Sequence, residues 1–356
     1  MTIASGVAHG MTSDRQTTAR SVAFVAGHRE PAETLGTDLA ELINDPDAFA
    51  TALRRGLAGL ADPEYLAGEQ RVAPGIGALH GVRGALLKAL QRGFRRASRL
   101  DRSTPLLFVA DRLFREPELE ARWFAFGLLK RTLDVETERT WQLLRRAARE
   151  AGDWITVDSL AHPYAQGIAA EPYRWAELEQ LVYSPSRWER RLVGSTIATM
   201  THGNGGSGRG QEVPGRALPI LAQLMGDAEP DVQKALSWAY RSLAAIGLRA
   251  TEAALRTEAD EATATSDGHR AWVIRDALGK LEPATAHELR TQLSGIRKRA
   301  GTPATSAAAT TVARFQDRPE PVASALVASE PLARSDTPAM TPATRSVPDP
   351  IGVTRP

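Results

Sequence analysis

Apolar residues recur through the middle of the chain at intervals of three and four residues, the spacing of one face of an α-helix. The pattern begins near Thr37, after which three apolar residues fall on one stripe, namely Leu39, Leu42 and Ile43. It continues to about residue 300. Alternating apolar and polar runs bounded by turn residues, which would predict strands, are absent. The pattern therefore predicts an all-α fold.

Proline supports the same interpretation, because it recurs just ahead of the apolar-periodic segments. The first turn of a helix tolerates proline, since the missing N–H has no partner there in any case. The residues in question are Pro63, Pro105, Pro117, Pro172, Pro185, Pro230 and Pro283.

Five predicted helices begin alike, with an acidic or turn residue followed by a large apolar residue or Trp. They start near Glu118, Asp153, Ser186, Pro230 and Asp267, which lie 33 to 44 residues apart. That interval is typical of stacked helix pairs in HEAT-like arrays, in which one helix of each pair lines a concave side. We expect an α-solenoid of HEAT-like repeats with a concave basic groove long enough for a polymer.

The two ends of the chain differ from its middle in composition. Residues 1–35 are rich in Ser, Thr, Ala and Gly without a sustained period, and nine of the 22 prolines lie between Pro303 and Pro356. Such segments bury too little apolar surface to offset the entropy of ordering them. We expect a disordered N-terminal arm over residues 1–35, a repeat domain over residues 36–300 and a disordered tail over residues 301–356.

Composition excludes several classes of protein. The 356 residues include 42% hydrophobic residues, enough for a large core, and no cysteine, which excludes disulfides and thiolate metal sites. The seven histidines show no pair at metal-ligand spacing, so we expect neither a metal nor another cofactor. No apolar run approaches the roughly 20 residues that cross a bilayer. We expect a cytoplasmic protein that does not enter membranes.

The net charge of +2 does not identify a nucleic-acid binder, but the charge is unevenly distributed. Six Lys and Arg residues and no acid lie between Ile76 and Leu100. Five of them share one face of a predicted helix, namely Lys88, Arg92, Arg95, Arg96 and Arg99, and another face carries Leu86, Leu90, Phe94 and Ala97. Phosphate binding and an ordinary solvated face explain this helix equally well.

Two glycine motifs are weaker signals. Pro74-Gly75-Ile76-Gly77 is similar to the hairpin of helix-hairpin-helix DNA-binding proteins, but a loop that enters a long helix explains it equally well. Residues 203–208 satisfy the dinucleotide-binding glycine pattern, but no strand precedes them. We interpret them as a flexible loop between repeats.

Three stretches combine aromatic and charged residues. Trp154 and Asp158 lie four residues apart, so that in a helix both side chains emerge from one face. The ring gains by burial whereas the carboxylate loses by it, so the acid needs a compensating partner. Trp188-Glu189-Arg190-Arg191 and Gln233-Lys234-Ala235 leading to Trp238 are candidates to complete the same site.

Together these stretches resemble the DNA alkylation repair family, the AlkD-type HEAT-like-repeat alkylpurine DNA glycosylases. In that family a Trp-x-x-x-Asp, a Trp-x-x-Arg and a Gln-Lys-Ala-x-x-Trp element build the active site. The resemblance extends over roughly residues 40–295. Ile155, where the family often has a second acid, and the glycine-rich segment from Gly203 to Gly210 depart from the family pattern.

The resemblance implies a monomeric DNA glycosylase that hydrolyses the N-glycosidic bond of cationic 3- or 7-alkylated purines in double-stranded DNA. It assigns catalysis to Trp154, Asp158, Arg191, which would grip a phosphate, and Trp238. It also implies DNA contacts by Lys88, Arg92, Arg95, Arg96, Arg99, Trp188, Arg190 and Lys234.

Other interpretations remain open from the sequence. The chain as a whole fits a non-catalytic HEAT-like module that binds DNA or protein, or a helix-hairpin-helix glycosylase. Among single residues, the two catalytic Trp candidates are, taken alone, more typical of core anchors between repeats. Asp158 is typical of a helix cap or an ion-pair partner of Arg191, and Arg191 of a solvated Arg190-Arg191 pair.

Overall fold

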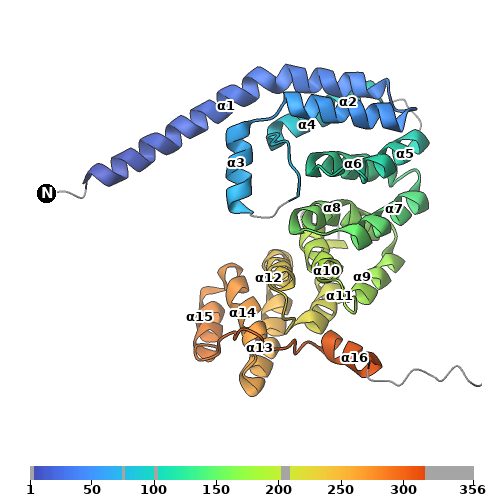
Figure 1. The fold of residues 1–356 in the computed structure, drawn as a ribbon. Helices are drawn as coiled ribbons and strands as arrows, with labels where there is room; N and C mark the ends of the chain where they lie inside the picture. Colours follow the sequence, from blue (N-terminus) through green and yellow to red (C-terminus); the bar gives the residue numbers. More distant parts are fainter. Residues whose placement is uncertain (1–3, 74–76, 100–102, 202–208, 317–356) are drawn as a thin grey trace, which may run out of the picture. The chain divides into compact units, whose positions relative to one another are not determined.

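The protein is helical throughout the residues that the computed structural model describes, which are 4–73, 77–99, 103–201 and 209–316. No β-strand occurs in these ranges, so the all-α prediction is confirmed (Figure 1). The chain divides into two units, Met1–Phe315 and Gln316–Pro356, and the fold below is that of the first. The first eight helices are α1 (Ala4–Ala40), α2 (Pro46–Gly59), α3 (Pro63–Val72), α4 (Gly84–Ala97), α5 (Ser103–Leu113), α6 (Leu119–Thr132), α7 (Thr137–Glu150) and α8 (Trp154–Ala170). The others are α9 (Trp175–Leu181), α10 (Arg187–Met200), α11 (Arg209–Leu224), α12 (Pro230–Ala244), α13 (Leu248–Thr265), α14 (Gly268–Ala277), α15 (Pro283–Gln292) and α16 (Ala307–Gln316), with short 3-10 helices at Pro172–Arg174 and Leu278–Lys280.

From α5 onward the helices pack in consecutive pairs, α5 with α6 through α13 with α14. The second helix of each pair also contacts the second helix of the next, and α4 extends this series at its start. We call the helices α4, α6, α8, α10, α12 and α14 the stacked row. Stacked pairs of this kind confirm the expected α-solenoid.

The predicted helix starts are also found in the structure. Glu118, Asp153, Ser186 and Asp267 each directly precede a helix of the stacked row, and Pro230 is the first residue of α12. Asp153 and Asp267 cap their helices by accepting backbone N–H bonds. Side-chain caps thus mark the starts of α8 and α14 and proline marks that of α12, whereas Glu118 and Ser186 hold the cap position without a side-chain hydrogen bond.

The prediction of a disordered N-terminal arm is wrong for its second half, residues 18–35, which are helical. Residues 4–40 form the single helix α1, whose second half packs along α4 and buries Ala32 and Leu39 (Figure 1). A Cβ atom on Gly36 would overlap the carbonyl oxygen of Leu90, and one on Gly93 would overlap that of Glu33. The two helices thus approach through glycines rather than through a stripe of large apolar residues, which is why the pattern did not reveal the contact.

The start of the C-terminal tail was also placed wrongly. Thr305 donates its backbone N–H to the carbonyl of Gly226 at 2.9 Å and its hydroxyl to Asp267. The buried ring of His269 lies 3.0 Å from the carbonyl of Thr302, and Ala308 in α16 is buried. The repeat domain therefore extends past residue 300, because buried groups find their hydrogen-bond partners there. Residues 317–356 of the expected tail lie outside the described residues.

The described part of the chain holds no helix long and apolar enough to cross a membrane. Nor do its described residues contain a cluster of three or more His, Cys, Asp or Glu that would hold a metal ion.

The loop before α4 is held by one carboxylate. Glu120 of α6 is buried and accepts the backbone N–H groups of His80, Gly81 and Val82. Gly81 has a φ of 82°, a conformation that glycine adopts without strain. Gly77, the described residue of the glycine motif, lies in the loop that leads into α4. Residues 74–76 and the glycines from 203 to 208 lie outside the described residues.

Candidate functional site

Trp154 and Asp158 lie one turn apart at the start of α8. The helix begins at Trp154 because Asp153 caps it, accepting the backbone N–H of Thr156 at 2.7 Å. The helix cap of α8 is therefore Asp153, and Asp158 does not act as its cap. Trp154 is 41% exposed, so this Trp is not a core anchor.

The Asp158 carboxylate is held by two residues of α10. Arg191 donates to it through Nε at 3.1 Å and Nη2 at 2.7 Å, and Ser195 donates its hydroxyl at 2.6 Å. Three donors fix the position of the carboxylate while 23% of the side chain stays exposed. Ser195 was not predicted, although its position four residues after Arg191 places both on one face of α10.

Arg191 is engaged mainly within the protein. Its Nε and Nη2 bind Asp158, and its Nη1 donates to the backbone carbonyl of Asp231 at 2.7 Å. Only 6% of its side chain is exposed, and its guanidinium lies 5.9 Å from the Trp154 ring. These contacts make Arg191 a residue that orients the Asp158 carboxylate, and its contact with a phosphate stays a prediction.

The charge around Arg191 is negative on balance. The Asp231 carboxylate lies 3.9 Å from its Nη1, so two carboxylates surround one guanidinium. Arg187 and Glu229 add one charge of each sign nearby. This group of residues, which we call the α8–α10 centre, therefore favours a cationic ligand.

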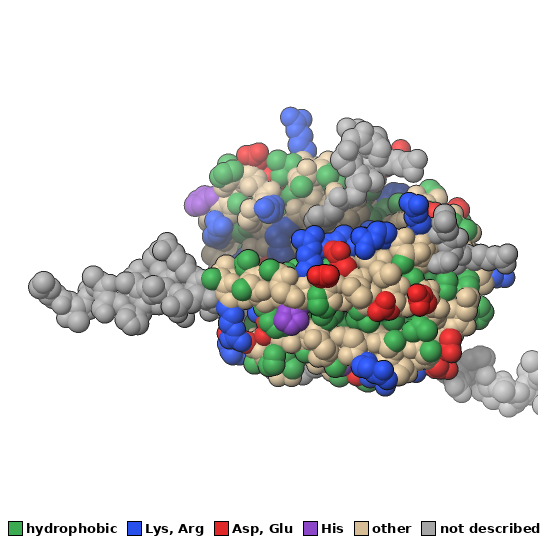
Figure 2. Space-filling view, turned by 90° about the horizontal axis from the view of Figure 1, so that it is seen from above, with side chains coloured by type: hydrophobic (Ala, Val, Ile, Leu, Met, Phe, Trp, Pro, Cys, Tyr) green, Lys and Arg blue, Asp and Glu red, His purple; other side chains and the backbone are tan. Residues whose placement is uncertain are grey.

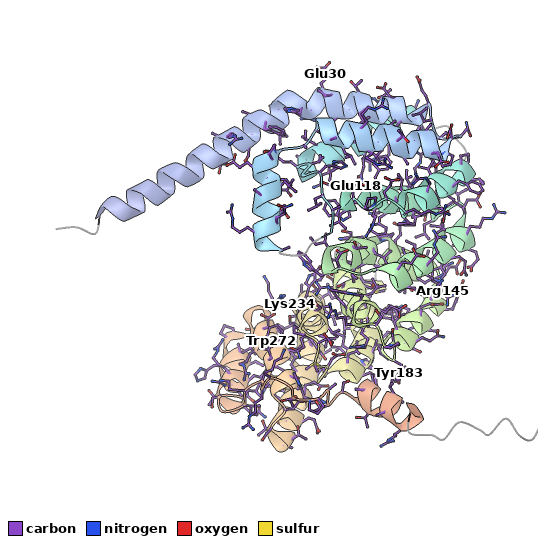
Figure 3. All side chains as sticks on the ribbon, in the orientation of Figure 1. Glu30, Glu118, Arg145, Tyr183, Lys234 and Trp272 are labelled. Atoms are coloured by element: carbon purple, nitrogen blue, oxygen red, sulfur yellow. The ribbon has the colours of Figure 1, made fainter. Side chains whose placement is uncertain are left out.

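Only part of the Gln-Lys-Ala-x-x-Trp element faces solvent. Gln233 is buried against His269 and Lys298, and Ala235 packs against Gly194, where a Cβ atom would come within 2.9 Å. Lys234 is exposed, and its side chain forms no hydrogen bond or ion pair with the described residues. Trp238 is half-buried against the core. The element thus presents the ammonium group of Lys234, labelled in Figure 3, and a half-buried indole on α12.

The predicted DNA contacts on α10 stay predictions. Arg190 donates through Nε to Asp227 at 2.7 Å and through Nη1 to the carbonyl of Ser184 at 2.8 Å, so most of its guanidinium is engaged within the protein. Trp188 is half-buried under the guanidinium of Arg187, and its contact with DNA stays a prediction.

Helix α4 carries the predicted basic face. Within the described part of the chain, Lys88, Arg95, Arg96 and Arg99 are exposed without an ion-pair partner, whereas Arg92 pairs with Glu33 of α1 at 3.1 Å. Leu86, Leu90 and Phe94 are buried, but Ala97 at the end of the helix is exposed. Figure 2 shows Lys and Arg side chains in a row beside a hollowed part of the surface. The helix is therefore amphipathic, with most of its cations free for an outside anion.

Comparison with known proteins places these elements in a family. A model of the family described as DNA alkylation repair enzyme matches residues 53–281, more than half of the chain. The matched region includes α4 and all three aromatic and charged elements. No curated protein matches the chain. The chain therefore belongs to the DNA alkylation repair enzyme family and has a role in DNA alkylation repair.

Proposed function

We propose that the protein is a DNA glycosylase that hydrolyses the N-glycosidic bond of cationic, alkylated purines in duplex DNA. The observation that supports this most is the Asp158 carboxylate, partly exposed beside Trp154 and fixed by Arg191 and Ser195. Such a carboxylate can stabilise positive charge that develops on the deoxyribose, which is the main requirement of the reaction.

A purine alkylated at N3 or N7 leaves readily, because it already carries a positive charge. The enzyme has to stabilise the positive charge that develops on the deoxyribose and to direct water to the anomeric carbon, as carboxylates do in glycoside hydrolysis. Oδ2 of Asp158 accepts a hydrogen bond only from Arg191 among the described residues, which leaves this oxygen able to accept one from water.

The aromatic residues supply a second contribution. An indole face attracts a cation by about 0.5–2 kcal/mol, depending on how far the pair is shielded from water. Trp154 has an exposed ring next to Asp158, and Trp238 presents part of its ring from α12. Both rings suit a cationic sugar or base, whereas an anionic ligand would gain nothing from them.

The direct test is release of modified purines from methylated duplex DNA by the full-length protein. We expect free 3- or 7-methylpurines and abasic sites in the DNA. Binding of the duplex without release would instead support a HEAT-like module that recognises DNA but does not cut the glycosidic bond.

Binding of DNA can be tested separately on α4. Replacing Arg95 and Arg99 by Ala should weaken binding to undamaged duplex DNA and reduce the slope of log affinity against log salt by up to about 0.9 for each phosphate that is no longer neutralised. The measurement is a salt titration of affinity by fluorescence anisotropy.

The matched control replaces Arg115 and Arg139 by Ala. Arg115 lies in the turn after α5 and Arg139 lies in α7, and both are highly exposed beside an acid. The net charge therefore changes by the same amount as in the α4 variant. If the two double variants lower the salt slope alike, the effect comes from total charge and α4 is an ordinary solvated face.

A further inference from the structure

A second Trp-x-x-x-Asp element lies on α14, formed by Trp272 and Asp276. Its spacing equals that of Trp154 and Asp158, so both side chains again share one helix face. In Figure 3 the labelled Trp272 lies close to Lys234 of the neighbouring helix α12.

The contacts of this second element repeat those of the first. Asp276 accepts the Ser237 hydroxyl at 2.6 Å, and Nη1 of Arg241 donates both to its carboxylate and, at 2.9 Å, to its backbone carbonyl. In each case the neighbouring helix of the stacked row supplies a Ser and an Arg four residues apart. We call Lys234, Ser237, Arg241, Trp272 and Asp276 the α12–α14 centre.

The two centres share only part of one level of the stacked row. The fifth residues of α8, α10, α12 and α14 are Asp158, Arg191, Lys234 and Trp272. Asp276 lies about one turn further along α14, and Arg241 lies about two turns further along α12. A ligand that crosses the row obliquely can therefore reach both centres.

The charge of the α12–α14 centre is opposite to that of the first. One carboxylate, Asp276, stands against the guanidinium of Arg241 and the ammonium of Lys234, a net charge of +1. Burial raises the pKa of Asp276, but the hydrogen bonds from Ser237 and Arg241 and the nearby positive charges outweigh it, so the pKa lies below its ordinary value. The centre therefore favours an anion, unlike the α8–α10 centre.

The two arginines also differ in which nitrogen atoms are free. Arg191 uses Nε and Nη2 for Asp158 and is nearly buried. Arg241 makes its contacts through Nη1, while Nε and Nη2 have no acceptor among the described residues, and its side chain is 32% exposed. Nε and Nη2 form the fork that binds two phosphate oxygens at once.

We propose that the α12–α14 centre binds a phosphodiester of the DNA backbone, with Arg241 as its ligand and Asp276 and Ser237 as the residues that orient Arg241. This rests on the proposed function, because it takes DNA as the ligand. Lys234 adds a second cation, and Trp238 lies between Lys234 and Arg241 on the same face of α12.

The distance from Asp158 shows which nucleotide this phosphate belongs to. Two steps of the stacked row, from α8 through α10 to α12, span about 16–20 Å, since packed helices lie 8–10 Å apart. The phosphate therefore belongs to a nucleotide other than the one whose sugar faces Asp158.

The first test is the affinity of Arg241→Ala for undamaged duplex DNA, which does not depend on any glycosylase activity. We expect binding to weaken by about tenfold and the salt slope to fall by about 0.9. Arg241→Lys keeps the charge and a partner for Asp276 but lacks the fork, so we expect weaker binding with an unchanged slope. The matched control is Arg256→Ala, which removes an interhelical pair with Glu288 between α13 and α15 and should leave affinity unchanged.

The second test is Asp276→Asn, which keeps an acceptor for Ser237 and Arg241 but removes the negative charge. Because the substitution weakens the contact that orients Arg241, we expect weaker binding of duplex DNA, and slower excision only to the extent that binding is weaker. Loss of excision at unchanged affinity would overturn the proposal, because it would make Asp276 a second reacting carboxylate. An unchanged affinity and salt slope in Arg241→Ala would overturn it as well.

A free phosphate is distinguished from DNA by thermal unfolding. At constant ionic strength we expect inorganic phosphate to leave the Tm of the wild-type protein unchanged, since one ion makes only a fraction of the contacts of a DNA strand. Stabilisation by inorganic phosphate that disappears in Arg241→Ala, together with unchanged affinity for DNA, would show that the centre serves a small anion instead.

Discussion

Asp158→Asn is expected to excise alkylated purines at least about 100-fold more slowly than the wild-type protein while it still binds duplex DNA. The substitution keeps the shape of the side chain and an acceptor for Ser195 but removes the charge that faces the sugar. A 100-fold loss corresponds to about 2.7 kcal/mol of transition-state stabilisation. Single-turnover excision from methylated duplex DNA measures it.

Asp158→Asn also removes the ionic partner of the nearly buried Arg191 guanidinium. Part of any loss of excision could therefore come from lower stability of the fold. We expect a loss of about 1–3 kcal/mol in the free energy of unfolding. Asp227→Asn is the matched control, because it removes the partner of Arg190, the neighbouring residue on α10. Both variants should lose stability, and only Asp158→Asn should lose excision. A stable Asp158→Asn protein with full activity would rule out the assignment of Asp158.

Ending the chain at residue 300 is expected to lower the free energy of unfolding by roughly 3–9 kcal/mol, whereas ending it at residue 316 should leave it nearly unchanged. The shorter chain leaves Gly226, Asp267 and His269 without their partners, at about 1–3 kcal/mol for each buried group. Chemical denaturation of both truncated chains beside the full chain measures the difference. Equal stability of the two truncated chains would show that residues 301–316 contribute nothing.

The sequence predicted the helix starts and the position of Trp154 and Asp158 on one face of α8, because each depends on local chemistry. Capping residues and prolines mark a helix start, and a spacing of four residues places Trp154 and Asp158 together whatever the rest of the fold does. The pairing of Asp158 with Arg191 followed as an alternative, since a half-buried carboxylate requires a partner.

The remaining features depend on contacts between distant segments. The packing of α1 on α4 uses Gly36 and Gly93, which leave no apolar stripe in the sequence. Arg190 and Arg191 look alike as neighbours, and only the positions of Asp227 and Asp158 show which arginine belongs to the site. Ser195 carried no signal of its own, because a hydroxyl acquires a role only when a carboxylate of another helix lies within its reach.

The division of the α8–α10 centre between two repeats has a consequence for partial unfolding. In a repeat array each unit is stabilised mainly by its neighbours, and the ends open at lower free energy than the middle. Asp158 keeps its position as long as α8 and α10 stay packed, whereas Arg241 is held through α14, which lies nearer the end of the described array. Unfolding that begins at the C-terminal end would then disrupt the Arg241 contact with DNA before the Asp158 carboxylate loses its orientation. Catalytic competence and hold on the substrate would thus fail at different concentrations of denaturant, although both depend on one continuous stack of helices.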